Sequence, residues 1–373
     1  MPIPIFDSRD LRCKSPFGAV KAGETVSFTL FPPPGTLGAE LLVFPADQWD
    51  SPRRIPFSPA LSEGRPAWQG SFVPQEPALL FYRFELSTED GSFRLLPDGQ
   101  NQGILAQEGV ALWQLTVYDG AMSTPAPLQK GVLYQIFPDR FRNGDSTNDV
   151  QTGEYLYEGR PVEKVEWTHP VDAWGDIHGH YGGDLAGITQ AVPYLQALGV
   201  TGLWLTPIFT SPSNHRYDTA DYTKIDPILG TEQDFTELCQ AAEKLGISII
   251  LDGVFNHTGY DSRYFNGRGR YDSVGAHQSQ ESPYYRWFDF QQWPDQYGSW
   301  WGIYTLPQVR EMDESYLDYI IDNEDSVIRR WLRLGASGWR LDVADELPDA
   351  FIRRLNAAAK QEKIGRASCR ERV

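Results

Sequence analysis

From Gly131 onward, short runs of apolar residues alternate with segments in which apolar residues recur at helical spacing. The apolar runs cover residues 131–141, 199–209, 247–257 and 338–344, and the helical segments cover residues 184–198, 231–245 and 315–334. Parallel strands that are buried on both faces have such sequences, and crossover helices join them. With a further helix starting near Pro348, this order predicts an α/β fold that contains about the first half of a TIM-type (β/α)8 barrel, rather than a finished doubly wound sheet.

The residues before this barrel follow a different pattern. Residues 1–125 are dense in Pro and Gly and contain short alternating runs such as LLFYRFEL at 79–86, which predicts an N-terminal β-sandwich. We therefore expect the barrel domain to span residues 126–363. Within it, residues 258–313 are far longer than an ordinary βα loop of about 2 to 6 residues and are rich in Tyr, Trp and Gly, so an inserted subdomain is expected there.

The charge balance is strongly acidic. The sequence has 33 Lys and Arg against 50 Asp and Glu, a formal net charge of -17, which repels nucleic-acid phosphates and anionic membranes. No apolar stretch of about 18 residues is present, the first residues lack the charged-then-apolar pattern of a secretory signal, and the three cysteines have no metal-ligand spacing. We expect a cytoplasmic protein that binds neither nucleic acid nor membrane.

Polar residues gather where the predicted strands end. Asp252, Asn256 and His257 follow the third strand, and Arg340 and Asp342 lie within the fourth. In a βα barrel these strand ends face the active site. Arg340 and Asp342 are two positions apart, so both side chains point to the same side of the strand, and a buried charged pair of this kind is either structural or functional.

Three segments resemble the α-amylase family of glycoside hydrolases, in the branch of neopullulanases, cyclomaltodextrinases and maltogenic amylases. They are SNHRYDTADYTKIDPILGT at 213–231, DGVFNHTG at 252–259 and GWRLDVADE at 338–346, and the match covers residues 128 to about 355. The DxxxNH and GxRxD patterns are weak signals alone, but their order and their placement on strands three and four make them specific together.

The resemblance implies a retaining mechanism. Asp342 would be the nucleophile that attacks the anomeric carbon, and Arg340 would hold that carboxylate ionised and oriented. Glu346 matches a family Glu near the leaving-group side, where the choice between water and sugar as acceptor is influenced. A retaining glycosidase also needs an acid about 5 to 5.5 Å from the nucleophile, and the family takes that Glu from a fifth strand, which we do not find in this sequence.

The resemblance also implies a set of substrate-binding residues. His257 would hydrogen-bond the sugar at the cleavage subsite, and Tyr217 would stack beneath the same ring. His215 and Asn256 would shape the site, and Asp252 would support it from behind. For these residues a purely structural role is the alternative.

A loop after the first strand offers oxygen ligands at close spacing. In NGDSTND these are Asn143, Asp145, Asn148 and Asp149, and calcium takes six to eight such oxygens. An Asx-rich turn is the alternative. In relatives with this loop, a glycine carbonyl and an aspartate of a GGD segment complete a calcium site, which implies Gly182 and Asp184 here.

Two histidines and the end of the chain are interpreted more simply. His178 and His180 have no third partner for zinc, so we interpret them as solvated loop residues. Residues 364–373 depart from the acidic balance and from the family pattern, and we expect them to be a non-native tail. The natural protein is then expected to continue through the remaining strands, and this chain alone is expected to be inactive.

Together these residues predict a hydrolase of α-1,4-glucosidic bonds in maltodextrins, cyclodextrins or pullulan, whose partners are α-glucan oligosaccharides. The alternatives are a glucosyltransferase or isomerase of the same fold, and a non-catalytic carbohydrate-binding protein in which the N-terminal sandwich has the main role. In related enzymes that sandwich resembles a starch-binding module and often builds a dimer, which implies a homodimer of the full-length protein.

Overall fold

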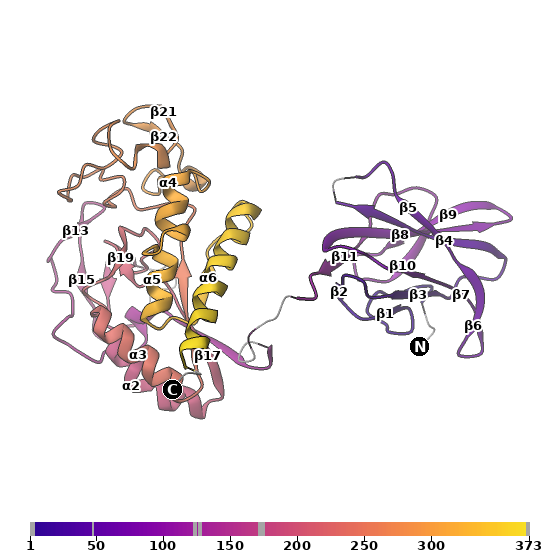
Figure 1. Cartoon of the computed structure of the whole chain (residues 1–373), viewed down its shortest axis with the longest axis horizontal. Helices are drawn as coiled ribbons and strands as arrows, with labels where there is room; N and C mark the ends of the chain where they lie inside the picture. The colour runs from indigo at the N-terminus through magenta and orange to yellow at the C-terminus, as the bar shows by residue number, and fades with distance from the viewer. Residues whose placement is uncertain (1–3, 47, 122–124, 126–128, 171–175, 371–373) are drawn as a thin grey trace. The chain divides into compact units, whose positions relative to one another are not determined.

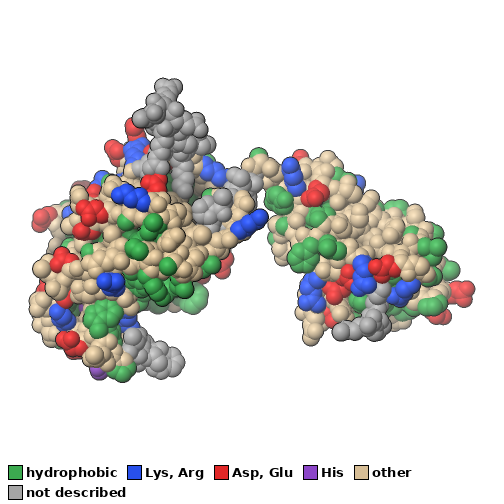
Figure 2. Space-filling model, turned by 90° about the horizontal axis from the view of Figure 1, so that it is seen from below, with side chains coloured by type: hydrophobic (Ala, Val, Ile, Leu, Met, Phe, Trp, Pro, Cys, Tyr) green, Lys and Arg blue, Asp and Glu red, His purple; other side chains and the backbone are tan. Residues whose placement is uncertain are grey.

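The computed structural model describes residues 4–46, 48–121, 125, 129–170 and 176–370 of the 373-residue chain. The chain divides into two compact units, Met1–Thr124 and Pro125–Val373 (Figure 1). On the face drawn in Figure 2, Lys and Arg side chains lie scattered beside Asp and Glu side chains on both units. Within the described part, none of the helices combines the length and apolar character needed to cross a membrane.

The first unit is a β-sandwich, as the alternating runs predict. One sheet has the order β1 (Lys14–Ser15), β3 (Val26–Leu30), β7 (Arg65–Phe72), β6 (Ser58–Ser62). The other has the order β10 (Gly103–Ala106), β9 (Gly91–Pro97), β8 (Ala78–Thr88), β11 (Trp113–Tyr118), β2 (Val20–Lys21), and β4 (Thr36–Pro45) joins β8 to β5 (Arg53–Pro56). The two sheets share one core, in which the ring of Phe28 lies 5.3 Å from Tyr82 and 5.7 Å from Phe84.

The second unit is built on a parallel sheet of four strands, in the order predicted from the apolar runs. The strands are β12 (Val132–Ile136), β17 (Val200–Leu205), β20 (Ser248–Gly253) and β23 (Gly338–Leu341). The helices are α2 (Leu185–Ala197), α3 (Glu232–Lys244), α4 (Glu314–Leu317), α5 (Val327–Leu334) and α6 (Asp349–Arg370). Helix α6 covers the helix predicted near Pro348. Its backbone continues through residues 364–370 of the predicted tail, and residues 371–373 of that tail lie outside the described residues.

Local sequence explains where α2 and α3 begin. Asp184 caps α2 by accepting a hydrogen bond from the backbone N–H of Gly187, at 2.6 Å. Thr231 and Asp234 form a reciprocal capping box at the start of α3. Both devices satisfy backbone N–H groups that have no partner inside the helix.

The helical segment predicted over 315–334 is not one helix, and this prediction is wrong in its continuity. A π-helical turn, η4 (Asp318–Asp322), follows α4, and the helix is interrupted before α5 starts at Val327. Asn323 Oδ1 accepts from the backbone N–H of Asp325, and the Ser326 hydroxyl donates to the carbonyl of Ile321. Short polar side chains that bond to nearby backbone in this way compete with helical hydrogen bonding.

The long segment 258–313 folds around aromatic side chains rather than regular elements. Its short elements are η2 (Tyr285–Trp287), β21 (Phe290–Gln292), β22 (Gln296–Tyr297) and η3 (Trp300–Gly302). The ring of Phe265 lies 4.9 Å from Phe288 and 4.7 Å from Tyr297. A hydrogen bond from the backbone N–H of Tyr222 to the Tyr264 hydroxyl, at 3.0 Å, joins this segment to β19.

One 3-10 helical turn and several short strands lie in the loops between the longer elements. They are η1 (Pro138–Arg140), β13 (Leu156–Tyr157), β14 (Arg160–Pro161), β15 (Glu163–Lys164), β16 (Gly179–His180), β18 (Phe209–Thr210) and β19 (Asp221–Ile225). At the outer edge of the four-stranded sheet, β12 presents apolar side chains to solvent, with Val132 and Leu133 each 52% exposed. This edge therefore lacks the apolar cover that the middle strands have.

Candidate active site

A carboxylate, a guanidinium and a second carboxylate meet at the ends of β20 and β23. The parallel register of these strands places Asp252 opposite Arg340. Nη1 of Arg340 lies 3.0 and 3.2 Å from the two oxygens of Asp252 and 2.6 Å from Oδ1 of Asp342. The predicted pair of Arg340 and Asp342 is thus formed, and one guanidinium nitrogen bridges two carboxylates.

Asp252 is the buried member of this group. Its side chain is fully shielded from solvent, whereas that of Asp342 is 14% exposed. The indole of Trp204 donates to Asp252 at 2.9 Å and the hydroxyl of Tyr217 donates at 3.3 Å. Burial raises the pKa of Asp252 to about 6, against the opposing effects of Arg340 and Trp204. Asp252 therefore anchors the guanidinium from inside, and Asp342 is the carboxylate open to a substrate.

Replacing Asp252 by Asn is expected to change how stability depends on pH. The folded-state pKa of Asp252, about 6, lies above the value of about 3.9 for an unfolded Asp. The folded chain therefore binds this proton more tightly, so the stabilising contribution is complete below about pH 4 and is lost as the pH rises through 6. The difference in unfolding free energy between the parent and Asp252→Asn should therefore change with pH. From pH 4 to pH 7 the parent should lose roughly 2 kcal/mol more than the variant. Urea unfolding of both chains measures it, and a difference independent of pH would contradict the prediction.

His215, Tyr217 and His257 lie together beside this group. The backbone N–H of Tyr217 donates to Nδ1 of His215 at 3.1 Å, and Nε2 of His257 lies 3.1 Å from the carbonyl oxygen of Tyr217. Burial lowers the pKa of both histidines, so both are neutral at pH 7. Because Nδ1 of His215 accepts, its ring hydrogen is on Nε2. His257 donates through Nε2, which leaves its buried Nδ1 as an acceptor with no partner among the described residues.

Asn256 carries a second unsatisfied group. Its side chain is buried, and neither Oδ1 nor Nδ2 has a hydrogen-bond partner in the described part of the chain. A buried amide without partners costs about 1 to 3 kcal/mol, so such groups usually mark a binding site or strain. The predicted residues Asn256 and His257 thus both carry buried polar atoms without a partner among the described residues.

Glu346 is held by two indoles that sequence reasoning did not identify. Trp300 donates to Oε2 at 2.9 Å and Trp301 donates to Oε1 at 2.8 Å. The two indole rings stack at 4.9 Å, and Trp300 also stacks on His257 at 5.2 Å. The adjacent residues WW of 300–301 were the available signal, but nothing in the sequence places them against Glu346.

Two further features near the site were also missed. Val343, directly after Asp342, has φ of +45°. This left-handed conformation is a genuine outlier for a β-branched residue. Residues in such strained conformations are concentrated at functional sites. Burial raises the pKa of Glu311 to about 7, and the charge of Glu346 adds to the shift. No sequence pattern predicts the backbone conformation of Val343 or the raised pKa of Glu311.

The loop predicted to bind calcium is closed around Asp184. Besides capping α2, Asp184 accepts hydrogen bonds from the backbone N–H groups of Gly144 at 3.0 Å and Asp145 at 2.8 Å. Asp145 accepts from Thr147, at 2.9 Å from its backbone nitrogen and 2.6 Å from its hydroxyl oxygen, as in an Asx turn. Oδ1 of Asn148 is buried and has no partner among the described residues. This oxygen is therefore available as a ligand for a cation.

The other predicted calcium ligands are Asn143, Asp149 and Gly182, and their side chains or backbone lie close to one another. Asn143 Nδ2 lies 2.6 Å from Asp149 Oδ1, and Lys164 lies 2.8 Å from Asp149 Oδ2. Gly182 has φ of +78°, and a side chain there would collide with Asp149 and Asn143. No cluster of three or more His, Cys, Asp or Glu side chains placed for a metal occurs within the described ranges. A cation here would therefore depend on amide and backbone oxygens as well as Asp149.

The interpretation of His178 and His180 as solvated loop residues is wrong. Their exposures are only 4% and 1%. Each ring packs against a tyrosine, His178 at 5.6 Å from Tyr157 and His180 at 6.4 Å from Tyr155, and Nε2 of His178 lies 3.0 Å from the carbonyl oxygen of Tyr157. Burial lowers the pKa of His180 to about 3, so this ring is neutral.

The second unit is a parallel β/α sheet with an arginine between two carboxylates at its strand ends, the arrangement expected from the resemblance to the α-amylase family. The chain belongs to the alpha-amylase family, because the sequence profile of the alpha amylase catalytic domain matches residues 135–367. The resemblance drawn from segments 213–231, 252–259 and 338–346 is thereby confirmed.

Individual relatives extend this match. An amylopullulanase of Thermoanaerobacter thermohydrosulfuricus is 36% identical over 394 residues, which cover 92% of this chain and 26% of that protein. Neopullulanase 2 of Thermoactinomyces vulgaris is 38% identical over 245 residues, which cover 64% of this chain and 38% of that protein. The solved type III pullulan hydrolase of Thermococcus kodakarensis has a TM-score of 0.58 at 27% identity and covers 97% of this chain and 60% of its own. The chain thus spans well under half the length of these two curated relatives.

Proposed function

We propose that the whole protein is a retaining glycoside hydrolase that cleaves α-1,4-glucosidic bonds in maltodextrins, cyclodextrins or pullulan. The observation that carries this proposal is the 2.6 Å contact of Arg340 with Asp342, beside a fully buried Asp252. The names of the relatives, amylopullulanase, Neopullulanase 2 and type III pullulan hydrolase, support the substrate class.

In the proposed mechanism, Asp342 attacks the anomeric carbon and forms a covalent glycosyl–enzyme while the bond to the leaving oxygen breaks. Arg340 orients the attacking carboxylate, and Tyr217 offers its ring face to the sugar. His257, whose ring stacks on Trp300, hydrogen-bonds the sugar at the cleavage subsite in this proposal. Water then releases the glucosyl unit with retention of configuration.

A leaving group in this mechanism needs a proton from an acid. The described residues contain no strand after β23 in the four-stranded sheet, and we propose that a further strand supplies this acid. By this proposal the 373-residue chain is inactive alone. Glu346, held by Trp300 and Trp301, lies on the leaving-group side and influences whether water or a sugar accepts the glucosyl unit.

We also propose a structural calcium ion at the loop of residues 143–149. Asn143, Asn148, Asp149 and the carbonyl of Gly182 would hold it, and the orphaned Oδ1 of Asn148 supports the proposal. When bound, the ion would tie this loop to the segment before α2. It would serve stability rather than the bond cleavage.

Removing calcium is expected to lower the Tm of this chain. An ion that binds only the folded state stabilises it by mass action, so EDTA should lower Tm by at least about 3 °C and added Ca²⁺ should restore it. Asn148→Ala should lose this response, and the exposed Asn356→Ala on α6 should keep it. Thermal unfolding followed by circular dichroism measures both, and a Tm that does not respond to calcium in the parent chain would refute the site.

The N-terminal sandwich is proposed to bind glucan or to mediate a homodimer of the whole protein. The support is that the matches to two relatives cover 92% and 97% of this chain and so include most of the sandwich. A cytoplasmic location is proposed on the odd number of cysteines, which is unusual for a disulfide framework. The alternative of a glucosyltransferase or isomerase uses the same nucleophile.

Product analysis tests the proposed function. The gene completed from its source DNA is expected to release reducing sugar from maltotriose, cyclodextrin and pullulan, and this chain is expected to release none. Formation of trehalose or an isomerised disaccharide instead would favour the alternative. No conversion of any of these substrates by the completed enzyme would refute the proposal.

A further inference from the structure

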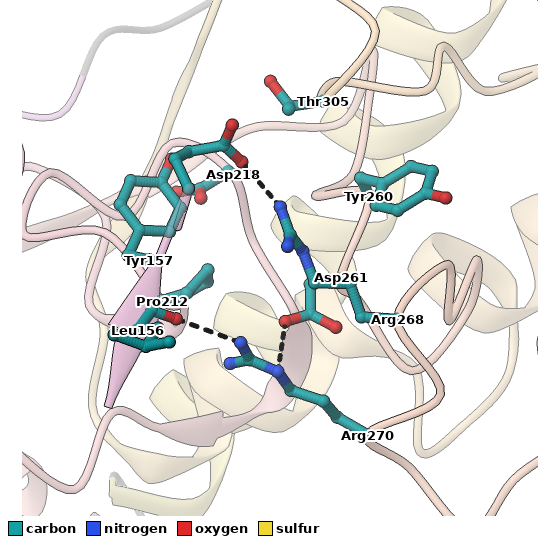
Figure 3. A pocket seen from close by; sticks show the side chains of 10 residues that line it. Leu156, Tyr157, Pro212, Asp218, Tyr260, Asp261, Arg268, Arg270 and Thr305 are labelled. Atoms are coloured by element: carbon teal, nitrogen blue, oxygen red, sulfur yellow. Dashed lines mark hydrogen bonds and ion pairs between the residues drawn. The ribbon is translucent and has the colours of Figure 1, made fainter. Parts of the chain in front are cut away.

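Two cavities share Tyr260 of the inserted segment, and they differ in what they can hold. Figure 3 shows the first, in which Arg270 pairs with Asp261 and donates to the carbonyl of Leu156. Its interior volume is about 10 Å³, no more than one water molecule needs. The second shares Tyr260 with the first, and its interior volume is about 310 Å³. Of these two cavities, the second is the one with room for an organic ligand.

We propose that this second cavity, the tyrosine pocket, binds a glucosyl unit of an α-glucan outside the cleavage site. The lining residues that matter for the argument are Tyr260, His277, Asp295, Gln296, Tyr297 and Tyr304. The proposal rests on the proposed function for the class of ligand, and adds a binding site that the catalytic group does not require.

Three aromatic rings form the apolar part of the pocket. The rings of Tyr260 and Tyr297 are nearly parallel, with centroids 6.4 Å apart, and Tyr304 meets Tyr260 edge-on at 6.3 Å. In Figure 3 the hydroxyl of Tyr260 points away from the arginine cluster of the first cavity. Tyr297 donates to the carbonyl oxygen of Tyr304 at 2.7 Å, which holds two of the walls together. Such ring faces pack well on the apolar face of a pyranose.

The polar part of the pocket suits a neutral ligand rich in hydroxyl groups. The side-chain amide of Gln296 forms no hydrogen bond with any described residue, so its N–H donors and its oxygen acceptor are open to a ligand. The Asp295 side chain is 84% exposed and lies 3.4 Å from His277. A carboxylate at the rim, on a chain of net charge -17, disfavours phosphorylated or acidic ligands. Ligand pockets are usually lined mainly by apolar and aromatic side chains, with a small number of polar groups that orient the ligand.

The pocket adjoins the aromatic stack of the cleavage site. Ser299 lines the pocket, and the next residue, Trp300, stacks on His257. Beyond Trp300, Trp301 is 75% exposed and Tyr304 is 61% exposed. An α-glucan in the pocket is therefore either a distant part of the chain being cleaved or a separate chain, and both have the same chemistry.

Calorimetric titration of the 373-residue chain with maltoheptaose tests the pocket. Tyr304→Ala should weaken binding by at least about fivefold, because it removes an aromatic wall. The ring of Tyr304 is largely exposed and its carbonyl still accepts from Tyr297, so the fold should persist. Tyr304→Phe keeps the ring and loses only the hydrogen bond to Glu158, and it should bind within about twofold of the parent. Gln296→Ala provides a second variant with no buried side chain.

Two further arms separate the sources of the ligand. If one glucan chain fills both the pocket and the cleavage site, Tyr304→Ala should weaken the binding of maltoheptaose and leave the binding of maltotriose unchanged. If the pocket holds a separate chain, the Tyr217→Ala variant of the cleavage site should still bind maltoheptaose. Adding Tyr304→Ala to that variant should then abolish this binding. Equal maltoheptaose affinity in the parent, Tyr304→Ala and Gln296→Ala, or no binding by the parent, would overturn the proposal. Loss of hydrolysis in the completed enzyme, with Tyr304-dependent binding intact, would refute only the proposed function.

Discussion

Asp342→Asn in the completed enzyme is expected to lower kcat by at least about a thousandfold on maltotriose, cyclodextrin and pullulan. The amide has the shape of the carboxylate and can still accept from Arg340, which lies 2.6 Å from Oδ1, so the site should keep its geometry. A neutral amide, however, is a very poor nucleophile toward the anomeric carbon, and removing a nucleophile leaves only the catalysis from binding and orientation. Reducing-sugar release at saturating substrate measures the effect.

The matched control is Asp345→Asn, three residues along the same turn. Asp345 is exposed and is not assigned to the site, so its kcat should stay within about twofold of the parent. KM of Asp342→Asn, where turnover remains measurable, should change little in comparison with kcat. Retention of more than a tenth of the parent kcat by Asp342→Asn would overturn the assignment of the nucleophile.

Arg340→Met is expected to have the largest effect on stability. Methionine retains much of the apolar stem, so the change removes mainly the cation that Asp252 contacts at 3.0 and 3.2 Å. Asp252 is fully buried, and breaking a buried pair by removing one partner leaves an uncompensated charge. We expect the unfolding free energy at pH 7.5 to fall by about 2 kcal/mol, less than the roughly 3 to 5 kcal/mol for a fully buried pair, because 34% of the arginine side chain is exposed.

The pH dependence separates lost charge pairing from lost packing. Burial raises the pKa of Asp252 to about 6, so at pH 5 the carboxyl is mostly protonated and needs no cation. The loss caused by Arg340→Met should therefore be much smaller at pH 5 than at pH 7.5, in urea unfolding of this chain. The double variant Arg340→Met with Asp252→Asn should recover much of the loss at pH 7.5. Equal losses at both pH values and in both backgrounds would show that packing, not charge, is responsible.

Periodicity in the sequence predicted the four strands of the parallel sheet and helices α2 and α3 of the second unit. The apolar runs that include Ile249 and Leu251 become middle strands because such residues are buried on both faces of a parallel sheet. The segment 315–334 was mispredicted as one helix, since periodicity does not register that Asn323 and Ser326 bond to nearby backbone. The burial of His178 and His180 was missed for a similar reason, because a pairing of two-residue strands leaves almost no pattern.

The sequence alone determined the β-sandwich, the order of the β/α units and the pair of Arg340 and Asp342, because these depend on local alternation and on the two-residue period of a strand. Only the tertiary structure decided that Asp252 shares the same guanidinium, that Trp300 and Trp301 hold Glu346, and that three tyrosines enclose a pocket. Asp252 and Arg340 are 88 positions apart and Trp300 and Glu346 are 46 apart, and the tyrosines stand on irregular loops, whose paths are set by packing of the whole unit rather than by local preference.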